Sequence, residues 1–217
     1  MGVSKQSVFQ LDPRQGKNAL AEHKTYKTVP KFSSLSTTND GFVAVGSDDG
    51  QIRLYDSISK VAKTCLPGLG DAIIGMDVTA DGSYLLATTR HYLLVIPTSV
   101  SGQAKSGFKQ SITNKAGAPI KLQLDPTDMA RFNIKQLSFT PAHFNTGEGE
   151  EEYISTSTGE YVVTWNFSAI KKGQRFHYKS VNNTIGSKLC INSFCAIILS
   201  RRLFLFLCYR PSLFDSC

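Results

Sequence analysis

The sequence DGFVAVGSDDGQIRLYD, residues 40–56, decides the fold of this 217-residue chain. It contains a turn dipeptide at Asp40-Gly41, an apolar run, a second turn at Asp48-Asp49-Gly50 and an alternating run that ends at Tyr55-Asp56. Because Asp and Gly accept turn conformations at little cost, the stretch predicts two antiparallel strands joined by the SDDG turn. The pattern recurs along the chain, and its copies predict the architecture.

Three further segments align with the closing pair Tyr55-Asp56, and they end at Leu11-Asp12, Ile96-Pro97 and Trp165-Asn166. Successive closing positions are 44, 41 and 69 residues apart. Periods of about 40–45 residues are typical of β-propeller blades, and WD repeats place Trp-Asp at this position. The sequence therefore predicts an all-β chain: a partial WD-repeat-like β-propeller of about three and a half blades, followed by a non-propeller C-terminal tail.

The predicted propeller domain covers residues 1–179, with blades near residues 1–29, 32–66, 73–124 and 134–179. Strands are expected near 7–12 and 24–29 in blade one, near 32–37, 42–46, 51–55 and 61–66 in blade two, and near 73–79, 84–89 and 92–96 in blade three. The inner strand of blade four is expected at 134–139. Residues 98–131 are predicted to form a long loop, residues 147–152 an acidic hairpin loop, and no helix is expected before residue 180. A propeller typically needs about 4–8 blades to close. We therefore interpret the pattern as a truncated propeller, a fragment of a longer protein. One alternative is that the fragment has no function of its own.

Residues 180–217 have a different composition. Residues 1–170 carry 16 Lys and Arg against 16 Asp and Glu, so the net charge of +7 arises entirely in the remainder of the chain. Four of the five cysteines also lie in residues 180–217. A membrane span needs about 20 apolar residues, and Arg201-Arg202 divides the apolar run. We interpret 180–217 as a read-through or disordered tail, and we expect no membrane span.

The residue types that support catalysis or metal binding are sparse. The four histidines have no metal-ligand spacing and no CxxC pair exists, so neither a metal nor a cofactor is predicted. The expected inner strands contain Asp77 as their one carboxylate, and one carboxylate cannot form a general acid–base pair. We therefore predict no catalytic residue and no small-molecule substrate. A propeller-based hydrolase is the alternative. The N-terminus lacks the apolar region of a signal peptide, which favours a cytoplasmic location, with a nuclear one possible.

One face of the predicted propeller supplies the candidate site. The loops between the second and third strands of each blade, and those between blades, emerge on the same face, where a rigid scaffold can present them to a partner. Seven residues from these loops form the predicted partner-binding rim: Asp48, Asp49, Pro67, Leu69, Asp71, Arg90 and His91. The competing interpretation is that Pro67 and its neighbouring glycines only shape a connection between blades. An exposed Leu69 would fit an interface, whereas a buried one would be a plug between blades.

A second segment could bind anions. Residues 101–121 contain Lys105, Lys109, Lys115 and Lys121 among Gly, Ser and Gln, with Phe108 as the one aromatic residue. This pattern allows a basic loop that binds phosphate or an acidic partner, nucleic acid included, although four spaced lysines on a polar loop are usually a solvated loop. Because residues 1–170 are neutral overall, we predict a protein partner and no nucleic-acid partner.

Several stretches resemble one family. They are VFQLDPR at 8–14, TTNDGFVAVGSDDGQIRLYD at 37–56, AKTCLPGLGDAIIGMDVTADGSYLLATT at 62–89, YLLVI at 92–96 and VVTWNF at 162–167. They are similar to the C-terminal WD-repeat-like domain of the vacuolar import and degradation protein twenty-seven family, whose plant members are called defective-embryo-and-meristems-like proteins. The resemblance covers roughly residues 2–179 and implies a cytoplasmic propeller scaffold linked to vacuolar import and degradation of cytosolic proteins. It supplies no catalytic residue.

Overall fold

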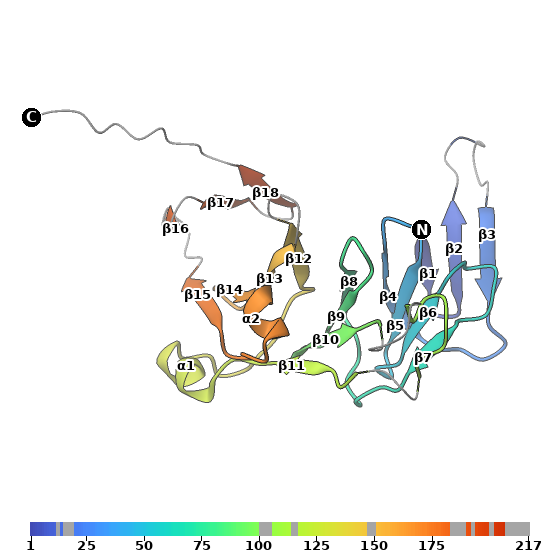
Figure 1. The fold of residues 1–217 in the computed structure, drawn as a ribbon. Coiled ribbons are helices and arrows are strands. Elements are labelled where there is room, and N and C mark those ends of the chain that lie inside the picture. Colours follow the sequence, from blue (N-terminus) through green and yellow to red (C-terminus); the bar gives the residue numbers. More distant parts are fainter. Residues whose placement is uncertain are drawn as a thin grey trace, which may run out of the picture.

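The computed structural model describes residues 1–11, 14, 20–99, 106–113, 117–146, 151–182, 190–191, 194–199 and 202–206. These residues form five antiparallel sheets. The four sheets of residues 2–182 stand side by side as blades, and Figure 1 shows them fanned out without closing into a ring. The structure confirms the prediction of a partial β-propeller.

Blades two and three are complete four-stranded sheets. Blade two has the order β4 (Phe32–Thr37), β5 (Val43–Ser47), β6 (Ile52–Tyr55) and β7 (Thr64–Leu66). Blade three has β8 (Gly75–Val78), β9 (Tyr84–Thr88), β10 (Leu93–Pro97) and β11 (Ile120–Leu122) in the same order from the inside outward. The observed strands lie close to the predicted ranges. The added strand is β11, which forms within the stretch that was predicted to be a loop.

Blade one has three strands among the described residues: β1 (Gly2–Ser4), β2 (Ser7–Leu11) and β3 (Leu20–Thr25). β1 packs beside β4, the inner strand of blade two. The strand predicted at 24–29 is wrong by about four residues, since β3 ends at Thr25 and residues 26–31 form the connection to blade two. The stretch LAEHKT has little intrinsic strand preference, and pairing with β2 along its whole length overrides it.

Blade four consists of β12 (His143–Thr146), β13 (Glu151–Thr158), β14 (Tyr161–Asn166) and β15 (Tyr178–Asn182). The predicted inner strand at 134–139 is wrong: this stretch belongs to the connection, where only Phe139 bridges to Thr158, and β12 is the inner strand. β12 and β13 pair as an antiparallel hairpin. Residues 147–150 of its acidic connection lie outside the described residues.

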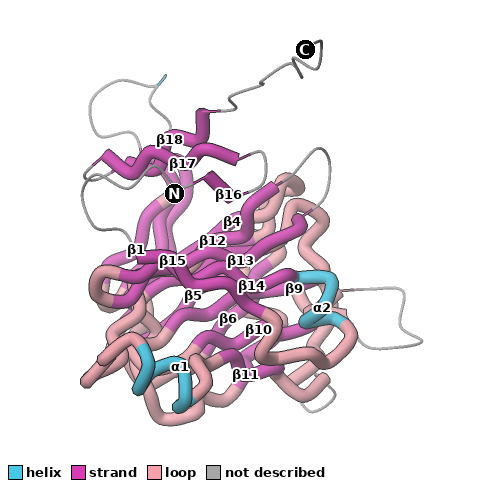
Figure 2. Tube along the Cα trace, turned by 90° about the vertical axis from the view of Figure 1, so that its left-hand side faces the viewer, coloured by secondary structure: helices cyan, strands magenta, loops and turns pink. Residues whose placement is uncertain are grey.

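Two short helices correct the expectation that no helix precedes residue 180. α1 (Pro126–Arg131) begins at Asp125, whose carboxylate accepts the Thr127 N–H, with Pro126 in the first turn. α2 (Phe167–Lys171) begins at Asn166, whose side chain accepts the Ala169 N–H at 2.8 Å. Both helices lie at the periphery of blade four (Figure 2). Each has only five or six residues, too few to produce a helical period in the sequence.

The hydrophobic core lies between the blades. Separate clusters fill the contacts between blades one and two, two and three, and three and four. Strands in the middle of the fan are covered on both faces, and every residue of β5 is buried. In β13, at the end of the fan, buried and partly exposed residues alternate. This difference explains why β5 reads as a continuous apolar run and β13 as an alternating one.

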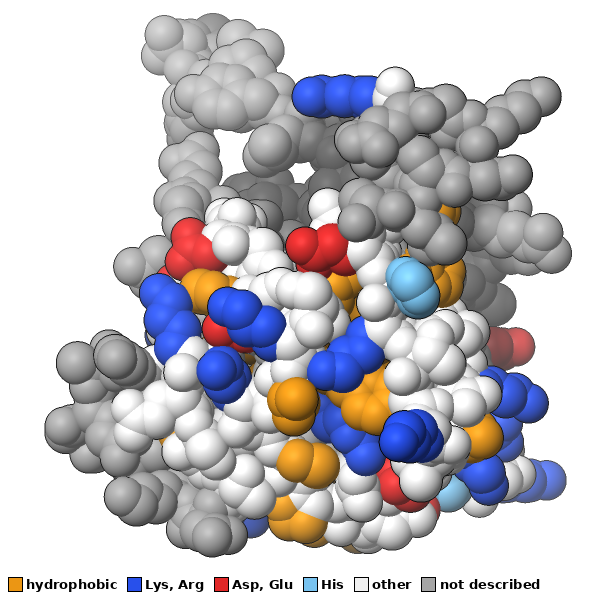
Figure 3. Space-filling model, turned by 90° about the vertical axis from the view of Figure 1, so that its right-hand side faces the viewer, with side chains coloured by type: hydrophobic (Ala, Val, Ile, Leu, Met, Phe, Trp, Pro, Cys, Tyr) orange, Lys and Arg blue, Asp and Glu red, His pale blue; other side chains and the backbone are white. Residues whose placement is uncertain are grey.

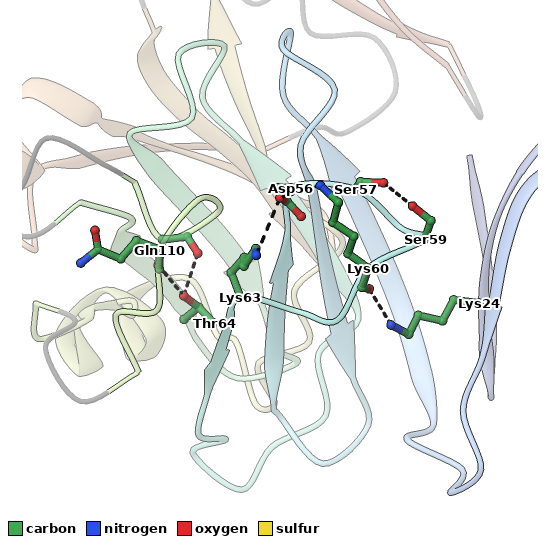
Figure 4. Close-up of polar contacts among 9 residues, drawn as sticks. Lys24, Asp56, Ser57, Ser59, Lys60, Lys63, Thr64 and Gln110 are labelled. Atoms are coloured by element: carbon green, nitrogen blue, oxygen red, sulfur yellow. Dashed lines mark hydrogen bonds and ion pairs between the residues drawn. The ribbon is translucent and has the colours of Figure 1, made fainter.

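Residues 106–113 lie on blade two, although they follow the inner strands of blade three. Phe108 and Ile112 are almost fully buried, and the Phe108 ring stacks on Phe42 at 5.6 Å between centroids. The Thr64 hydroxyl of β7 donates to the carbonyls of Gly107 at 2.7 Å and Gln110 at 3.2 Å (Figure 4). This segment therefore binds blade three to the outer edge of blade two.

Residues 190–206 contain a separate three-stranded sheet of β16 (Cys190–Ile191), β17 (Phe194–Leu199) and β18 (Arg202–Phe206), whose described strands pair with one another. Most of the predicted tail, including residues 183–189 and 207–217, lies outside the described residues. The prediction that residues 180–217 are read-through or disordered stays a prediction.

Candidate functional site

The turn between β5 and β6 has a fixed backbone. The Gly50 N–H donates to the Ser47 carbonyl at 3.0 Å, and the Asp49 carboxylate accepts the Gln51 N–H at 3.0 Å. Gly50 has φ +80°, in the left-handed region that favours glycine. The side chains of Asp48 and Asp49 are exposed above this turn.

The connection from blade two to blade three packs directly on this turn. A Cβ atom at Gly68 would lie 2.2 Å from the Asp49 carbonyl oxygen, and one at Gly50 would lie 2.8 Å from the Asp71 carbonyl oxygen. Only glycine permits such an approach between two backbones. Between these close contacts, the side chain of Leu69 is 57% exposed and Pro67 is exposed. The glycines have the structural role that the competing interpretation gave them, and Leu69 has the exposure that an interface requires.

Blade three continues the rim. His91 Nδ1 lies 3.9 Å from Asp71 Oδ2, and both side chains are about half exposed. Burial, and then the neighbouring Asp71 carboxylate, raise the pKa of Tyr92 above its ordinary value. Arg90 is exposed, and its carbonyl accepts the Phe139 N–H at 2.9 Å, which joins this turn to the connection toward blade four.

The seven predicted rim residues thus lie on adjacent loops at the same end of the strands. Direct contacts link the 48–50 turn with the 67–71 connection, and Asp71 with His91. Whether these residues bind a partner stays a prediction.

Two neighbours of the rim were missed in the sequence. The sequence pattern places Tyr92 in a strand and groups Lys121 with the other lysines of residues 101–121. Lys121 Nζ lies 4.3 Å from the centroid of the Tyr92 ring. The position of Tyr92 directly after His91 could have placed it at the rim. No local feature of the sequence places Lys121 beside Tyr92.

The two described lysines of the 101–121 segment lie on different blades. Lys109 Nζ lies over the Phe42 ring at 4.9 Å, on blade two, whereas Lys121 covers Tyr92 on blade three. Lys105 and Lys115 lie outside the described residues. Among the described lysines, the predicted basic loop is therefore not a single surface.

A second polar cluster connects the inner strands of three blades. Asp77 on β8 accepts the Phe144 N–H of β12 at 2.9 Å, and its other oxygen accepts the Ser36 hydroxyl of β4 at 3.4 Å. His143 Nδ1 lies 3.4 Å from Asp77 Oδ2. The sequence indicated Asp77 alone, because the wrong inner strand for blade four left His143 out.

Ser36, Asp77 and His143 form a structural clamp between blades, because the direction of their hydrogen bonds does not fit a catalytic relay. A Ser-His-Asp relay requires the hydroxyl to donate to the imidazole. Here the Ser36 hydroxyl donates to the carboxylate of Asp77, which also accepts two backbone N–H groups and faces His143. The cluster connects blades two, three and four.

The His143 contact predicts a pH dependence of stability. The hydrogen bond to Asp77, followed by its charge, raises the pKa of His143 above 6.5, against an opposing effect of burial. Because the folded pKa is raised, the stabilisation is fully present below the unfolded pKa of 6.5 and is lost as the pH rises through the folded pKa. We expect His143→Gln to destabilise the protein more at acidic than at alkaline pH, by a small amount since the side chain is 67% exposed. Guanidinium unfolding of the unaltered chain and of His143→Gln, at one pH below 6.5 and one above the folded pKa, measures the difference in destabilisation. Equal destabilisation at both pH values would contradict a stabilising contact between protonated His143 and Asp77.

In the described ranges, His, Cys, Asp and Glu side chains nowhere gather in a group of three that could hold a metal ion. No helix within the described part of the chain is long and apolar enough to span a membrane.

Comparison with known proteins identifies relatives across most of the chain. The model of the VID27 C-terminal WD40-like domain matches residues 1–186. Vacuolar import and degradation protein 27 of Schizosaccharomyces pombe is 42% identical over 189 residues, covering 82% of this chain and 24% of the relative. The protein of the same name from Saccharomyces cerevisiae is 38% identical over 181 residues, covering 78% of this chain and 23% of the relative. The chain spans about a quarter of the length of these relatives.

A solved structure with the same fold is the β-propeller domain of Cps50 (Swd1) from Myceliophteria thermophila. It superposes with a TM-score of 0.50 at 13% identity, covering 76% of this chain and 46% of that one. This likeness concerns the fold alone. The match over residues 1–186 and the two yeast relatives together show that the chain belongs to the VID27 C-terminal WD40-like domain family.

Proposed function

We propose that this chain is a non-enzymatic scaffold that binds a protein partner through the rim formed by Asp48, Asp49, Pro67, Leu69, Asp71, Arg90 and His91. The observation that carries the proposal is the exposed Leu69, which is held on a backbone packed tightly against the neighbouring turn. Protein interfaces have an apolar core within a polar rim, and an exposed leucine among charged groups fits that arrangement. A fixed loop also loses little conformational entropy on binding.

The family name suggests the process. The relatives are named for vacuolar import and degradation, and we propose that the partner belongs to that process and that the chain acts in the cytoplasm. The clamp geometry of Asp77 and His143 supports a scaffold over a hydrolase, because the hydroxyl of Ser36 is bonded to the carboxylate.

The rim is tested by Leu69→Asp combined with Asp48→Lys. Both side chains are exposed, so folding should be unaffected, while burying the new charges at an interface should weaken binding by at least about tenfold. Quantitative affinity capture from extracts of the source cells measures the loss.

The matched control is Phe176→Asp, which alters a 61% exposed apolar residue on the connection between α2 and β15. Partners should be retained by this variant and lost by the rim variant. If both variants recover the same proteins as the unaltered chain, the rim is not the binding surface.

A further inference from the structure

The connection between β6 and β7, residues 56–63, forms a second exposed surface. The rim turn at 48–50 enters β6 and this connection leaves it, so the two lie at opposite ends of the strand. Val61 at its tip is 73% exposed, a larger fraction than at Leu69. Figure 3 shows this side of the molecule, where Lys and Arg side chains surround exposed hydrophobic ones.

The connection is held in a defined conformation. Ile58 is buried in the core between blades one and two with 2% exposure. The Lys63 N–H donates to the Leu54 carbonyl at 2.8 Å. From blade one, Lys24 Nζ donates to the Lys60 carbonyl at 2.6 Å, as Figure 4 shows. Val61 is therefore presented on a preformed loop that both blades support.

Lys60 and Lys63 flank Val61 in the connection, and Lys24 on β3 reaches the carbonyl of Lys60. Lys109 lies over Phe42, in the turn between β4 and β5 at the same end of the strands. We call these four lysines and Val61 the basic patch. Within the connection the only acid is Asp56, whose Oδ2 is shared by Lys60 at 3.5 Å and Lys63 at 4.0 Å.

The patch keeps a positive charge near Val61. The Asp56 side chain is only 22% exposed, whereas those of Lys60 and Lys63 are 63% and 40% exposed. A single recessed carboxylate cannot neutralise both ammonium groups. Among the described residues, Asp56 is the one acid that forms an ion pair with these lysines.

The composition fits an anionic lipid surface better than a nucleic acid. Lysine ammonium groups on flexible stems act as point charges toward a diffuse negative surface. An exposed apolar side chain between them can enter the acyl boundary. The aromatic faces at this patch are occupied, since Lys24 lies over Tyr26 and Lys109 over Phe42, so they cannot stack on bases.

We propose that the basic patch docks this chain on the surface of a membrane that contains anionic phospholipids, with Val61 inserted among the headgroups. The rim at the opposite end of the strands then faces away from the membrane, free to hold a protein partner. This docking does not depend on the function of the rim.

Vesicle co-sedimentation of the full chain tests the proposal. Binding to phosphatidylcholine vesicles that contain phosphatidylserine should exceed binding to phosphatidylcholine alone, and it should fall with added salt. Lys60→Glu with Lys63→Glu should reduce the binding by at least about 25-fold, since each juxtamembrane lysine contributes about fivefold. Val61→Asp should also reduce it.

The matched controls are Lys171→Glu with Lys172→Glu on the α2 side of blade four, and Val29→Asp at another exposed valine. Both should bind anionic vesicles as the unaltered chain does. Equal binding to neutral vesicles, or equal losses in patch and control variants, would overturn the proposal. So would stronger retention by a single-stranded oligonucleotide than by the anionic vesicles, or loss of vesicle binding in a rim variant with the patch intact.

Discussion

Trp165→Ala is expected to lower the free energy of unfolding by about 3–5 kcal/mol. Trp165 is fully buried on β14, where its ring meets Phe139 at 6.1 Å and Tyr178 at 5.6 Å between centroids. Removing the indole leaves a cavity in the core that joins blades three and four. Guanidinium unfolding followed by circular dichroism measures the loss.

A conservative change at the same position separates packing from hydrogen bonding. The indole N–H of Trp165 makes no hydrogen bond within the described residues. Trp165→Phe therefore removes only part of the buried side-chain volume. We expect it to lower the free energy of unfolding by much less than Trp165→Ala does. If phenylalanine were as damaging as alanine, packing of the ring would not be the source of the stability.

Phe108→Ala is expected to have an effect of similar size, about 3–5 kcal/mol. Phe108 is fully buried against Phe42 and belongs to the core of blades two and three. Its loss should release residues 106–113 from β7. Lys109→Ala, at the exposed neighbouring position, is the control and should change the free energy of unfolding only slightly.

The single tryptophan makes the Phe108 experiment informative about cooperativity. Trp165 fluorescence reports on blade four, whereas circular dichroism reports on all blades. If the described blades unfold as one unit, both signals should shift together in Phe108→Ala. A shift in circular dichroism with unchanged tryptophan fluorescence would show that blade four unfolds independently.

The sequence predicted blades two and three well because their strands follow the repeat at regular spacing. Tyr55-Asp56 and Ile96-Pro97 both close a third strand, and the runs before them lie in buried strands. The prediction for blade four is wrong at the inner strand, because residues 134–139 mix apolar and polar residues as a half-buried strand does but lie in the connection before β12. Only tertiary pairing with β13 selects His143–Thr146 instead.

The positions of the rim residues were predicted in part, again because the blades repeat regularly. The propeller topology correctly placed Asp71 near His91 and the 48–50 turn near the 67–71 connection, since loops at one end of adjacent blades must meet. The contact of Lys121 with Tyr92 depends on β11, a three-residue strand without a sequence signal. The anchoring of Phe108 was equally hidden, because a lone aromatic in a polar segment does not reveal which blade it contacts.

The most direct test of the rim is a photo-crosslinker at position 69. With Leu69 replaced by benzoylphenylalanine, irradiation in cells should produce discrete protein adducts, since this side chain lies at the centre of the proposed interface. The same group at Phe176 should not give these adducts, and Asp48→Lys should weaken them. Identical adducts from positions 69 and 176, or none from position 69, would contradict the proposal that this rim binds a protein partner.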